Sequence, residues 1–192
     1  MIRYYDVDIA GLKRRLPLYL IDEDTCGAVF VAFNDIELTI KAAEELLKQV
    51  PEFDVILTEE VQGIPLAFEM SRQAGMSRYI VARKQAKVPM DDVVAIRVES
   101  PDGEDVRKLY LTKDDAEYLC GKRVLLVDDY VLHGSTIFAL TELTNANGGY
   151  VVGSAAILMQ QDASVFEGLV TLGMLPIFHV DGVVKDLNEL KD

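Results

Sequence analysis

The chain is poor in cysteine and contains no tryptophan. Its two cysteines, Cys26 and Cys120, lie far apart, and neither has a partner at metal-binding spacing. A disulfide framework and a cysteine-based metal site are therefore not expected. We expect both to be reduced, partly buried thiols, and we assign them no function.

Long apolar runs are also missing. No stretch approaches the roughly 18 to 20 consecutive apolar residues that a membrane-spanning helix needs. The first residues, Met1 to Asp6, lack the apolar core of a signal peptide. The sequence therefore predicts a cytoplasmic protein without a membrane partner.

Basic residues are scarce as well. The 19 lysines and arginines are outnumbered by 32 acidic residues, which gives a net charge of −13 and a pI near 4.5. A general nucleic-acid surface needs a basic patch or stripe, so nucleic acid is not an expected partner. The few basic clusters become informative for the same reason. The two densest are Lys13-Arg14-Arg15 and Arg83-Lys84 with Lys87.

The chain does have enough apolar residues for a substantial core, since half of its 192 residues are hydrophobic. The central stretch runs from Val124 to Thr136. Four apolar residues, Val124 to Val127, predict a strand buried on both faces, and Asp128 and Asp129 follow where that strand is expected to end. A helix is expected to begin at Ser135 or Thr136.

This order of strand, acidic pair, loop and helix has a chemical meaning. A helix N-terminus presents free backbone N–H groups to an anion, Gly134 permits close approach, and two hydroxyl residues follow it. The acidic pair would repel a phosphate and favours hydroxyl groups or a cation. The combination indicates a sugar phosphate. The alternative is an ordinary α/β loop, in which the acids only cap a turn or a helix.

Strand and helix patterns alternate along the rest of the chain. This alternation predicts a doubly wound parallel α/β sheet, which binds ligands at the carboxyl ends of its strands. The expected elements are a short helix over Leu12–Leu16 with an extended piece after Pro17, a strand over Ala28–Phe33, a helix over 36–49, a strand over 55–57, a helix over 65–74, a strand over 79–82, a hairpin flap over 91–111, a helical turn over 114–118, the strand over 124–127, a helix over 137–143, a strand over 150–158, and extended pieces over 170–172 and 176–178.

The central stretch resembles the signature of the type I phosphoribosyltransferases, which bind phosphoribosyl pyrophosphate (PRPP). Leu125 to Asp129 and Gly134 to Thr136 match that signature. His133 stands where the family usually has threonine, and Tyr130 replaces a small aliphatic residue.

Two further segments resemble the same family. Thr58 to Leu66 is similar to its pyrophosphate loop, and Arg83-Lys84-x-x-Lys87 is similar to a stretch of the adenine (purine) phosphoribosyltransferase branch. The tail Leu172 to Phe178 also resembles that branch. Each segment has an alternative interpretation, since the first can be an ordinary strand-to-helix loop and the second a solvated rim.

The resemblance implies a role for each matching residue. Asp128 and Asp129 would hold the ribose hydroxyls in catalysis, with Glu99 or Glu104 as a flap carboxylate, and Tyr130 and Val131 would contact the base. Mg²⁺ would bind through the substrate and not in a dedicated protein site. The 5′-phosphate would be bound by Tyr130, Val131, Leu132, His133, Gly134, Ser135 and Thr136, and the pyrophosphate by Glu60, Val61, Arg83, Lys84 and Lys87.

At the level of the whole chain, the resemblance implies a single domain over residues 1–192. Residues 1–27 and about 160–192 would form a small hood over the base, and residues 91–111 a flexible flap. The expected function is transfer of phosphoribosyl from PRPP to a purine base, most simply adenine, by a homodimer. Because of His133, a PRPP-binding regulatory protein with weak or no transferase activity stays open. So does an α/β domain with no PRPP site.

Overall fold

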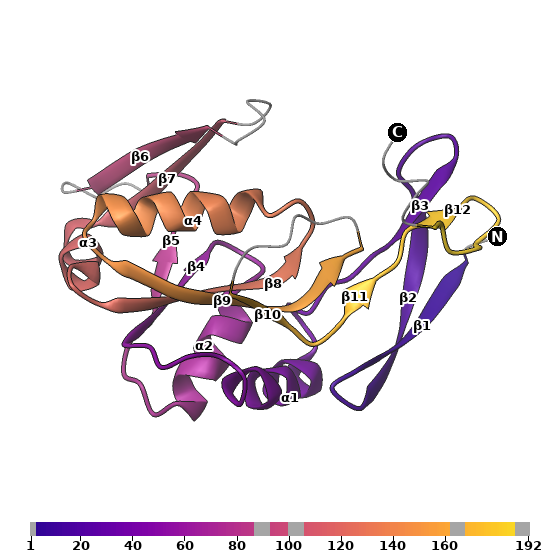
Figure 1. Ribbon diagram of the computed structural model, residues 1–192, viewed down its shortest axis with the longest axis horizontal. Coiled ribbons are helices and arrows are strands. Elements are labelled where there is room, and N and C mark those ends of the chain that lie inside the picture. Colours follow the sequence, from indigo (N-terminus) through magenta and orange to yellow (C-terminus); the bar gives the residue numbers. More distant parts are fainter. Residues whose placement is uncertain (1–2, 87–92, 100–105, 162–167, 187–192) are drawn as a thin grey trace.

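The centre of the fold is a parallel sheet in the order β10-β9-β8-β4-β5, with β11 also pairing with β9 (Figure 1). The computed structural model describes residues 3–86, 93–99, 106–161 and 168–186. The strands of this sheet are β4 (Val55–Glu59), β5 (Ile80–Ala82), β8 (Arg123–Val131), β9 (Tyr150–Gln160), β10 (Leu169–Thr171) and β11 (Met174–Leu175). The predicted parallel α/β sheet is confirmed.

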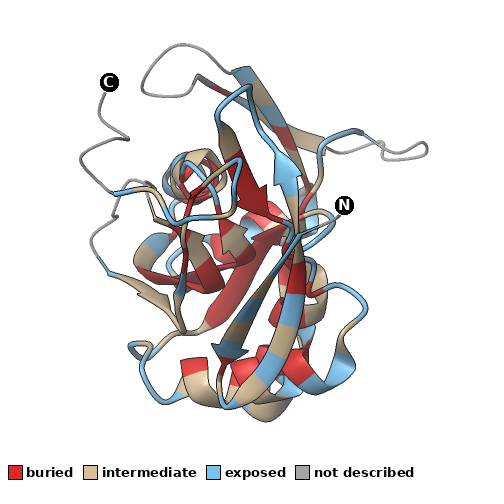
Figure 2. Cartoon of the chain, turned by 90° about the vertical axis from the view of Figure 1, so that its right-hand side faces the viewer, coloured by how far each residue is buried: buried red, intermediate tan, exposed pale blue. Residues whose placement is uncertain are grey.

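Helices cover both faces of the sheet. Helices α1 (Ile36–Leu47) and α2 (Ile64–Gln73) lie on one face, and α4 (Ser135–Ala146) lies on the other (Figure 1). Successive residues of a strand point to opposite faces, so Ile56 of β4 joins the core beneath α1 and α2, whereas Leu57 joins the core beneath α4. Both faces are apolar for this reason, and Figure 2 shows the central strands as buried.

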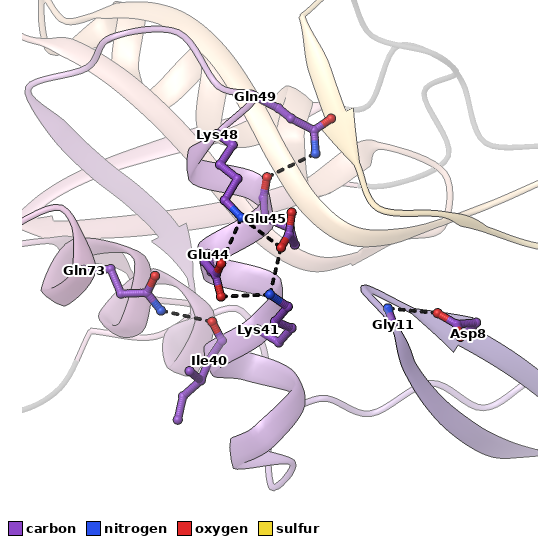
Figure 3. Close-up of polar contacts among 9 residues, drawn as sticks. All are labelled: Asp8, Gly11, Ile40, Lys41, Glu44, Glu45, Lys48, Gln49 and Gln73. Carbon is purple, nitrogen blue, oxygen red and sulfur yellow. Dashed lines mark hydrogen bonds and ion pairs between the residues drawn. The ribbon is translucent and has the colours of Figure 1, made fainter.

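The helices begin where the sequence predicts. Asp35 caps α1, because its carboxylate accepts a hydrogen bond of 3.1 Å from the backbone N–H of Leu38. Pro65 lies in the first turn of α2, where its missing N–H has no helical partner. The side chain of Gln73 on α2 donates a 3.0 Å hydrogen bond to the carbonyl of Ile40 on α1, which ties the two helices together (Figure 3).

The two terminal segments meet in a separate antiparallel sheet in the order β1-β2-β3-β12. Its strands are β1 (Tyr4–Ile9), β2 (Leu12–Leu20), β3 (Thr25–Ala28) and β12 (Phe178–His179). In Figure 1 this sheet stands beside one end of the central sheet. The prediction that these segments act as a hood over a base stays a prediction.

Two predictions for the N-terminal part of the chain are wrong. The helix over Leu12–Leu16 is the first half of β2, because a tight turn with positive φ at Ala10 and Gly11 folds this segment back onto β1. The strand expected over Ala28–Phe33 does not form over that range. Strand β3 ends at Ala28, which is the last residue that pairs with β2, and one backbone hydrogen bond of 2.9 Å from the N–H of Val29 to the carbonyl of Pro17 follows it. Residues 29–33 keep a strand-like alternation of burial but have no described strand partner beyond that point.

The expected hairpin is present as β6 (Val93–Glu99) and β7 (Val106–Thr112), which pair antiparallel. Its tip, including Glu104, lies outside the described residues. Backbone bonds of 2.9 Å in both directions between Arg83 and Tyr110 fix the base of this hairpin at the end of β5. The short helix α3 (Lys113–Leu119) then leads into β8. No helix among the described residues combines the length and apolar character needed to cross a membrane.

Candidate functional site

A pocket of about 250 Å³ lies at the carboxyl ends of β4, β5 and β8. This is the edge at which parallel α/β sheets bind ligands. The pocket brings together parts of the three loops that the sequence analysis selected. Its walls are formed by Phe30, Glu59, Glu60, Val61, Gln62, Lys84, Asp128, Asp129, Tyr130 and Thr136.

The acidic pair lies on strand β8 and not after it. The expected strand end at Val127 is wrong, because the pairing with β9 continues through Asp128 with Ala156, Tyr130 with Leu158 and Val131 with Met159. Both carboxylate residues are consequently buried, with exposures of 8% for Asp128 and 5% for Asp129. The strand therefore holds them in fixed positions at the wall of the pocket.

Burial makes these two carboxyl groups harder to ionise. It raises the pKa of Asp128 to about 8, with repulsion from Asp129 as the second cause and a smaller contribution from Glu59. Burial also raises the pKa of Asp129, partly offset by hydrogen bonds that include one from the backbone of Ala32. Hydroxyl donors or a cation in the pocket would favour the ionised forms of both groups.

The loop after β8 and the start of α4 have the geometry of an anion site. Gly134 adopts a left-handed conformation with φ of 76° and precedes Ser135, the first residue of α4. Its carbonyl accepts the first helical bond, 3.0 Å from the N–H of Phe138. The N–H groups of the first turn therefore remain available at the helix N-terminus. His133 and Leu132 are exposed on this loop.

Glu59 is the last residue of β4 and Glu60 begins the second loop, which connects β4 to α2; both residues contact the basic segment after β5. The Glu60 carboxylate accepts a 2.9 Å hydrogen bond from the backbone N–H of Lys84 and lies 3.9 Å from the Arg83 guanidinium. The Lys84 ammonium lies 3.0 Å from Glu59. The peptide bond between Glu60 and Val61 is cis. Two of the three predicted pyrophosphate cations are thus placed beside the pocket, while Lys87 lies outside the described residues.

Gly63 allows this loop to pack tightly against β8. A side-chain Cβ at this position would lie 2.3 Å from the Thr58 hydroxyl and 3.2 Å from both the Cα of Asp128 and the carbonyl oxygen of Val127. Backbone atoms cannot move aside as a flexible side chain can. Glycine therefore sets the short distance between the second loop and the acidic pair.

The predicted base contacts have different environments. The Tyr130 ring lies on the pocket wall, 6.1 Å from the Phe30 ring, and its hydroxyl bonds to Gln160 at 3.1 Å. Val131 is buried in the apolar core on the α4 side. Glu99 is the last residue of β6, and its side chain is outside the described part of the chain.

Phe30 and Arg107 were not singled out from the sequence, and Glu59 was included only as part of the Thr58–Leu66 loop, without a role of its own. Arg107 on β7 reaches Glu59 at 3.0 Å, Thr136 at 3.1 Å and Ser135 at 2.9 Å. The only signal for Arg107 in the sequence was its place in an alternating strand. That pattern gives the two faces of a strand but not the element that each face meets.

Within the described residues, no three side chains of metal-binding type converge on one point.

The sequence is similar to those of known phosphoribosyltransferases. An adenine phosphoribosyltransferase of Cenarchaeum symbiosum is 34% identical over 119 residues, which are 61% of this chain and 66% of that protein. An orotate phosphoribosyltransferase of Caldanaerobacter subterraneus is 28% identical over 152 residues, 77% of this chain and 68% of that protein. The chain thus spans slightly less than two thirds of the length of the first of these relatives.

The fold has solved counterparts too. A crystal structure of adenine phosphoribosyltransferase from Thermoanaerobacter pseudethanolicus superposes with a TM-score of 0.58 at 22% identity, covering 73% of this chain and 82% of that one. The sequence model of the phosphoribosyl transferase domain matches residues 32–167, which include all three loops of the pocket. Since this match extends over more than half of the sequence, the chain belongs to the phosphoribosyl transferase domain family.

Proposed function

We propose that this protein transfers the phosphoribosyl group of PRPP to a purine base, adenine in the first instance, with release of pyrophosphate. The observation that carries the proposal is the meeting of three loops at one pocket. A phosphorylated ribose with a pyrophosphate group requires three parts, and the pocket offers a candidate for each. These are an acidic pair, a helix N-terminus with two hydroxyl residues, and a basic segment whose lysine forms an ion pair with Glu59.

Each part has a separate task in this proposal. Asp128 and Asp129 accept hydrogen bonds from the ribose hydroxyls, which compensate for the burial of the two carboxylates. The N–H groups from Tyr130 to Thr136 and the Ser135 and Thr136 hydroxyls hold the 5′-phosphate. Glu60, Val61, Arg83, Lys84 and Lys87 position pyrophosphate. Mg²⁺ held through the substrate would supply counter-charge to the departing pyrophosphate.

Catalysis in this scheme is mainly positioning and electrostatic stabilisation. The reacting sugar becomes cationic at C1 and would be intercepted by water. The β6–β7 hairpin over the α4 face is the element suited to exclude it, with Glu99 or Glu104 as its proposed carboxylate.

The base is the least constrained part of the proposal. The rings of Phe30 and Tyr130 give the pocket an aromatic wall on which a flat heterocycle can pack, and Val131 is proposed only as support beneath that wall. Adenine is preferred because the chain is 34% identical to an adenine phosphoribosyltransferase, but an orotate phosphoribosyltransferase is also similar. A homodimer and a cytoplasmic location belong to the same proposal, and light scattering tests the first.

A second function is favoured by one observation. His133 stands in the exposed loop where the family usually carries threonine. A PRPP-binding regulatory protein could tolerate this change, because a histidine that is cationic can still attract phosphate. The variant His133→Thr separates the two functions. Transferase activity that appears only in His133→Thr supports the regulatory protein, whereas an active wild type that changes little supports the enzyme.

The experiment that tests the proposal is calorimetric titration with PRPP and Mg²⁺, followed in the same cell by purine bases and orotate. We expect wild-type binding, loss of binding in Asp128→Asn/Asp129→Asn, and pyrophosphate release with one base. The control is Asp114→Asn/Glu117→Gln, which neutralises two exposed carboxylates on α3. Absence of PRPP binding to the wild type contradicts the proposal, and binding without product for any base supports the regulatory function.

A further inference from the structure

Among the described residues of the flap, Arg107 contacts the start of the proposed phosphate-binding helix α4. Arg107 extends from β7, and its guanidinium donates hydrogen bonds to the hydroxyls of Ser135 at 2.9 Å and Thr136 at 3.1 Å. These are the first two residues of α4, at the helix N-terminus. A positive charge on the flap is thereby placed next to the proposed anion site.

These two hydrogen bonds determine whether the Ser135 and Thr136 hydroxyls act as donors or as acceptors toward a ligand. A guanidinium has only donors, so each hydroxyl oxygen accepts from Arg107 and keeps its own O–H for another acceptor. A phosphate has only acceptor oxygens when it is fully ionised. Arg107 therefore prepares both hydroxyls to donate to a phosphate held at the N-terminus of α4, and it adds a charge-assisted donor of its own.

Glu59 holds Arg107 in this position. The Glu59 carboxylate lies 3.0 Å from the Arg107 guanidinium. The Glu59 side chain is 5% exposed and the Arg107 side chain is 28% exposed. The same carboxylate lies 3.0 Å from the ammonium group of Lys84, in the segment that follows β5. One buried acid thus positions two cations, Lys84 from the end of β5 and Arg107 from the flap.

We propose that Arg107 is a ligand of the substrate 5′-phosphate, carried on the flap and positioned by Glu59. This inference rests on the proposed function, since it assigns a further residue to the same PRPP site. It also links two events: a phosphate at the N-terminus of α4 gives the flap an additional partner, and the docked flap gives the phosphate an additional donor. Binding of the 5′-phosphate therefore stabilises the contact between β7 and the start of α4.

The test uses two ligands that occupy different parts of the proposed site. Ribose 5-phosphate and pyrophosphate, each with Mg²⁺, are titrated separately into the wild type, Arg107→Gln, Arg107→Lys and Lys108→Gln. Lys108 is the matched control, because it is the next residue on β7, carries the same charge and lies 5.3 Å from the Tyr110 ring. Hydrogen exchange of the β7 amides is followed with and without ribose 5-phosphate.

We expect Arg107→Gln to weaken ribose 5-phosphate binding by about tenfold to a hundredfold, as for loss of a hydrogen bond to a charged group. Pyrophosphate binding should change by less than about threefold, a range within ordinary context effects. Arg107→Lys should recover part of the affinity because it keeps the charge without the fork of donors. Ribose 5-phosphate should protect β7 amides in the wild type and in Lys108→Gln, but not in Arg107→Gln.

Three results would overturn the inference. Equal binding of ribose 5-phosphate by the wild type and Arg107→Gln would remove Arg107 from the site and leave the proposed function standing. Equal loss of both ligands in Arg107→Gln would show that Arg107 only supports the flap. A wild type that binds neither ligand would contradict the proposed function, and the role of Arg107 would be rejected with it.

Discussion

The acidic pair shows how the position of a residue on a strand changes its chemistry. Asp128 and Asp129 continue β8 and are almost fully enclosed, whereas two carboxylates in an open loop would be solvated. Burial disfavours the charged form, and the proximity of the two groups adds repulsion. The pair therefore destabilises the ligand-free fold when it is ionised, and a ligand that donates hydrogen bonds to it relieves that cost.

This argument predicts a pH-dependent gain in stability for Asp128→Asn. The pKa of Asp128 is raised from 3.8 to about 8 in the fold, so the folded state binds more protons than the unfolded state between these values. The contribution of Asp128 to the free energy of unfolding consequently falls as the pH rises through that window. We expect Asp128→Asn to be more stable than the wild type at pH 8 by about 1 to 3 kcal/mol, with a smaller difference at pH 5.

Urea unfolding at pH 5, 6.5 and 8 measures this difference. Asp114→Asn, an exposed carboxylate on α3, serves as the control and should show little change with pH. A stability difference for Asp128→Asn that is the same at all three pH values would mean that the carboxyl group does not titrate in this window.

At the scale of elements, one arginine connects the N-terminal sheet to the core. Arg14 on β2 lies 2.6 Å from the Asp35 carboxylate and 2.8 Å from Glu37, and Asp35 also caps α1. Its guanidinium is the main reason that the pKa of Asp35 is lowered. The contact therefore fixes the strand pair β1–β2 against the first turn of α1 and next to the segment that carries Phe30.

We predict that Arg14→Gln loosens the N-terminal sheet and destabilises the protein by about 0.5 to 1.5 kcal/mol, a discounted value for a partly exposed ion pair. Because the folded pKa of Asp35 is lowered, this stabilisation is present at neutral pH and is lost as the pH falls through the folded pKa. Hydrogen exchange of β2 amides measures the effect. Arg15→Gln is the control, since Arg15 is 68% exposed and 3.7 Å from Asp6; an equal loss in both variants would contradict the prediction.

Elements with strong local signals could be predicted from the sequence. Helix α1 has a capping Asp35, and β4 and β8 have apolar runs that fit burial on both faces. Elements decided by partners distant in the sequence could not. The segment over Leu12–Leu16 has apolar spacing compatible with a helix, and only its pairing with β1 makes it a strand. Residues 29–33 have the pattern of a strand but continue no ladder.

The same distinction applies to the pocket. The three loops were found because each joins a strand to a charged or glycine-containing segment, and parallel strands bring their carboxyl ends to one edge. Arg107 was missed, and Glu59 of the predicted loop received no role of its own, because the contact between them depends on the position of the flap relative to α4. Strand alternation carries no information about that position. The extra length of β8, which encloses the acidic pair, depends likewise on its pairing with β9.

At the scale of the whole molecule, the pocket joins parts that are otherwise separate in sequence. Phe30 follows the N-terminal sheet, Glu59 ends β4, Asp128 lies on β8, and Arg107 reaches the site from the flap. A ligand held by all of them must bind the folded chain and not the unfolded one. Its binding energy then adds to the stability of the entire fold.

We therefore predict that PRPP with Mg²⁺ at 100 times its dissociation constant stabilises the protein by about 2.7 kcal/mol. In a chain with a net charge of −13, an anionic ligand without a counter-ion meets overall repulsion, so chelation of Mg²⁺ should reduce the gain. Thermal unfolding with PRPP, with and without Mg²⁺ and EDTA, measures both effects. Asp128→Asn/Asp129→Asn should show no gain while Asp114→Asn/Glu117→Gln keeps it. An equal rise in melting temperature for wild type and Asp128→Asn/Asp129→Asn would mean that PRPP stabilises the fold from some place other than the acidic pocket.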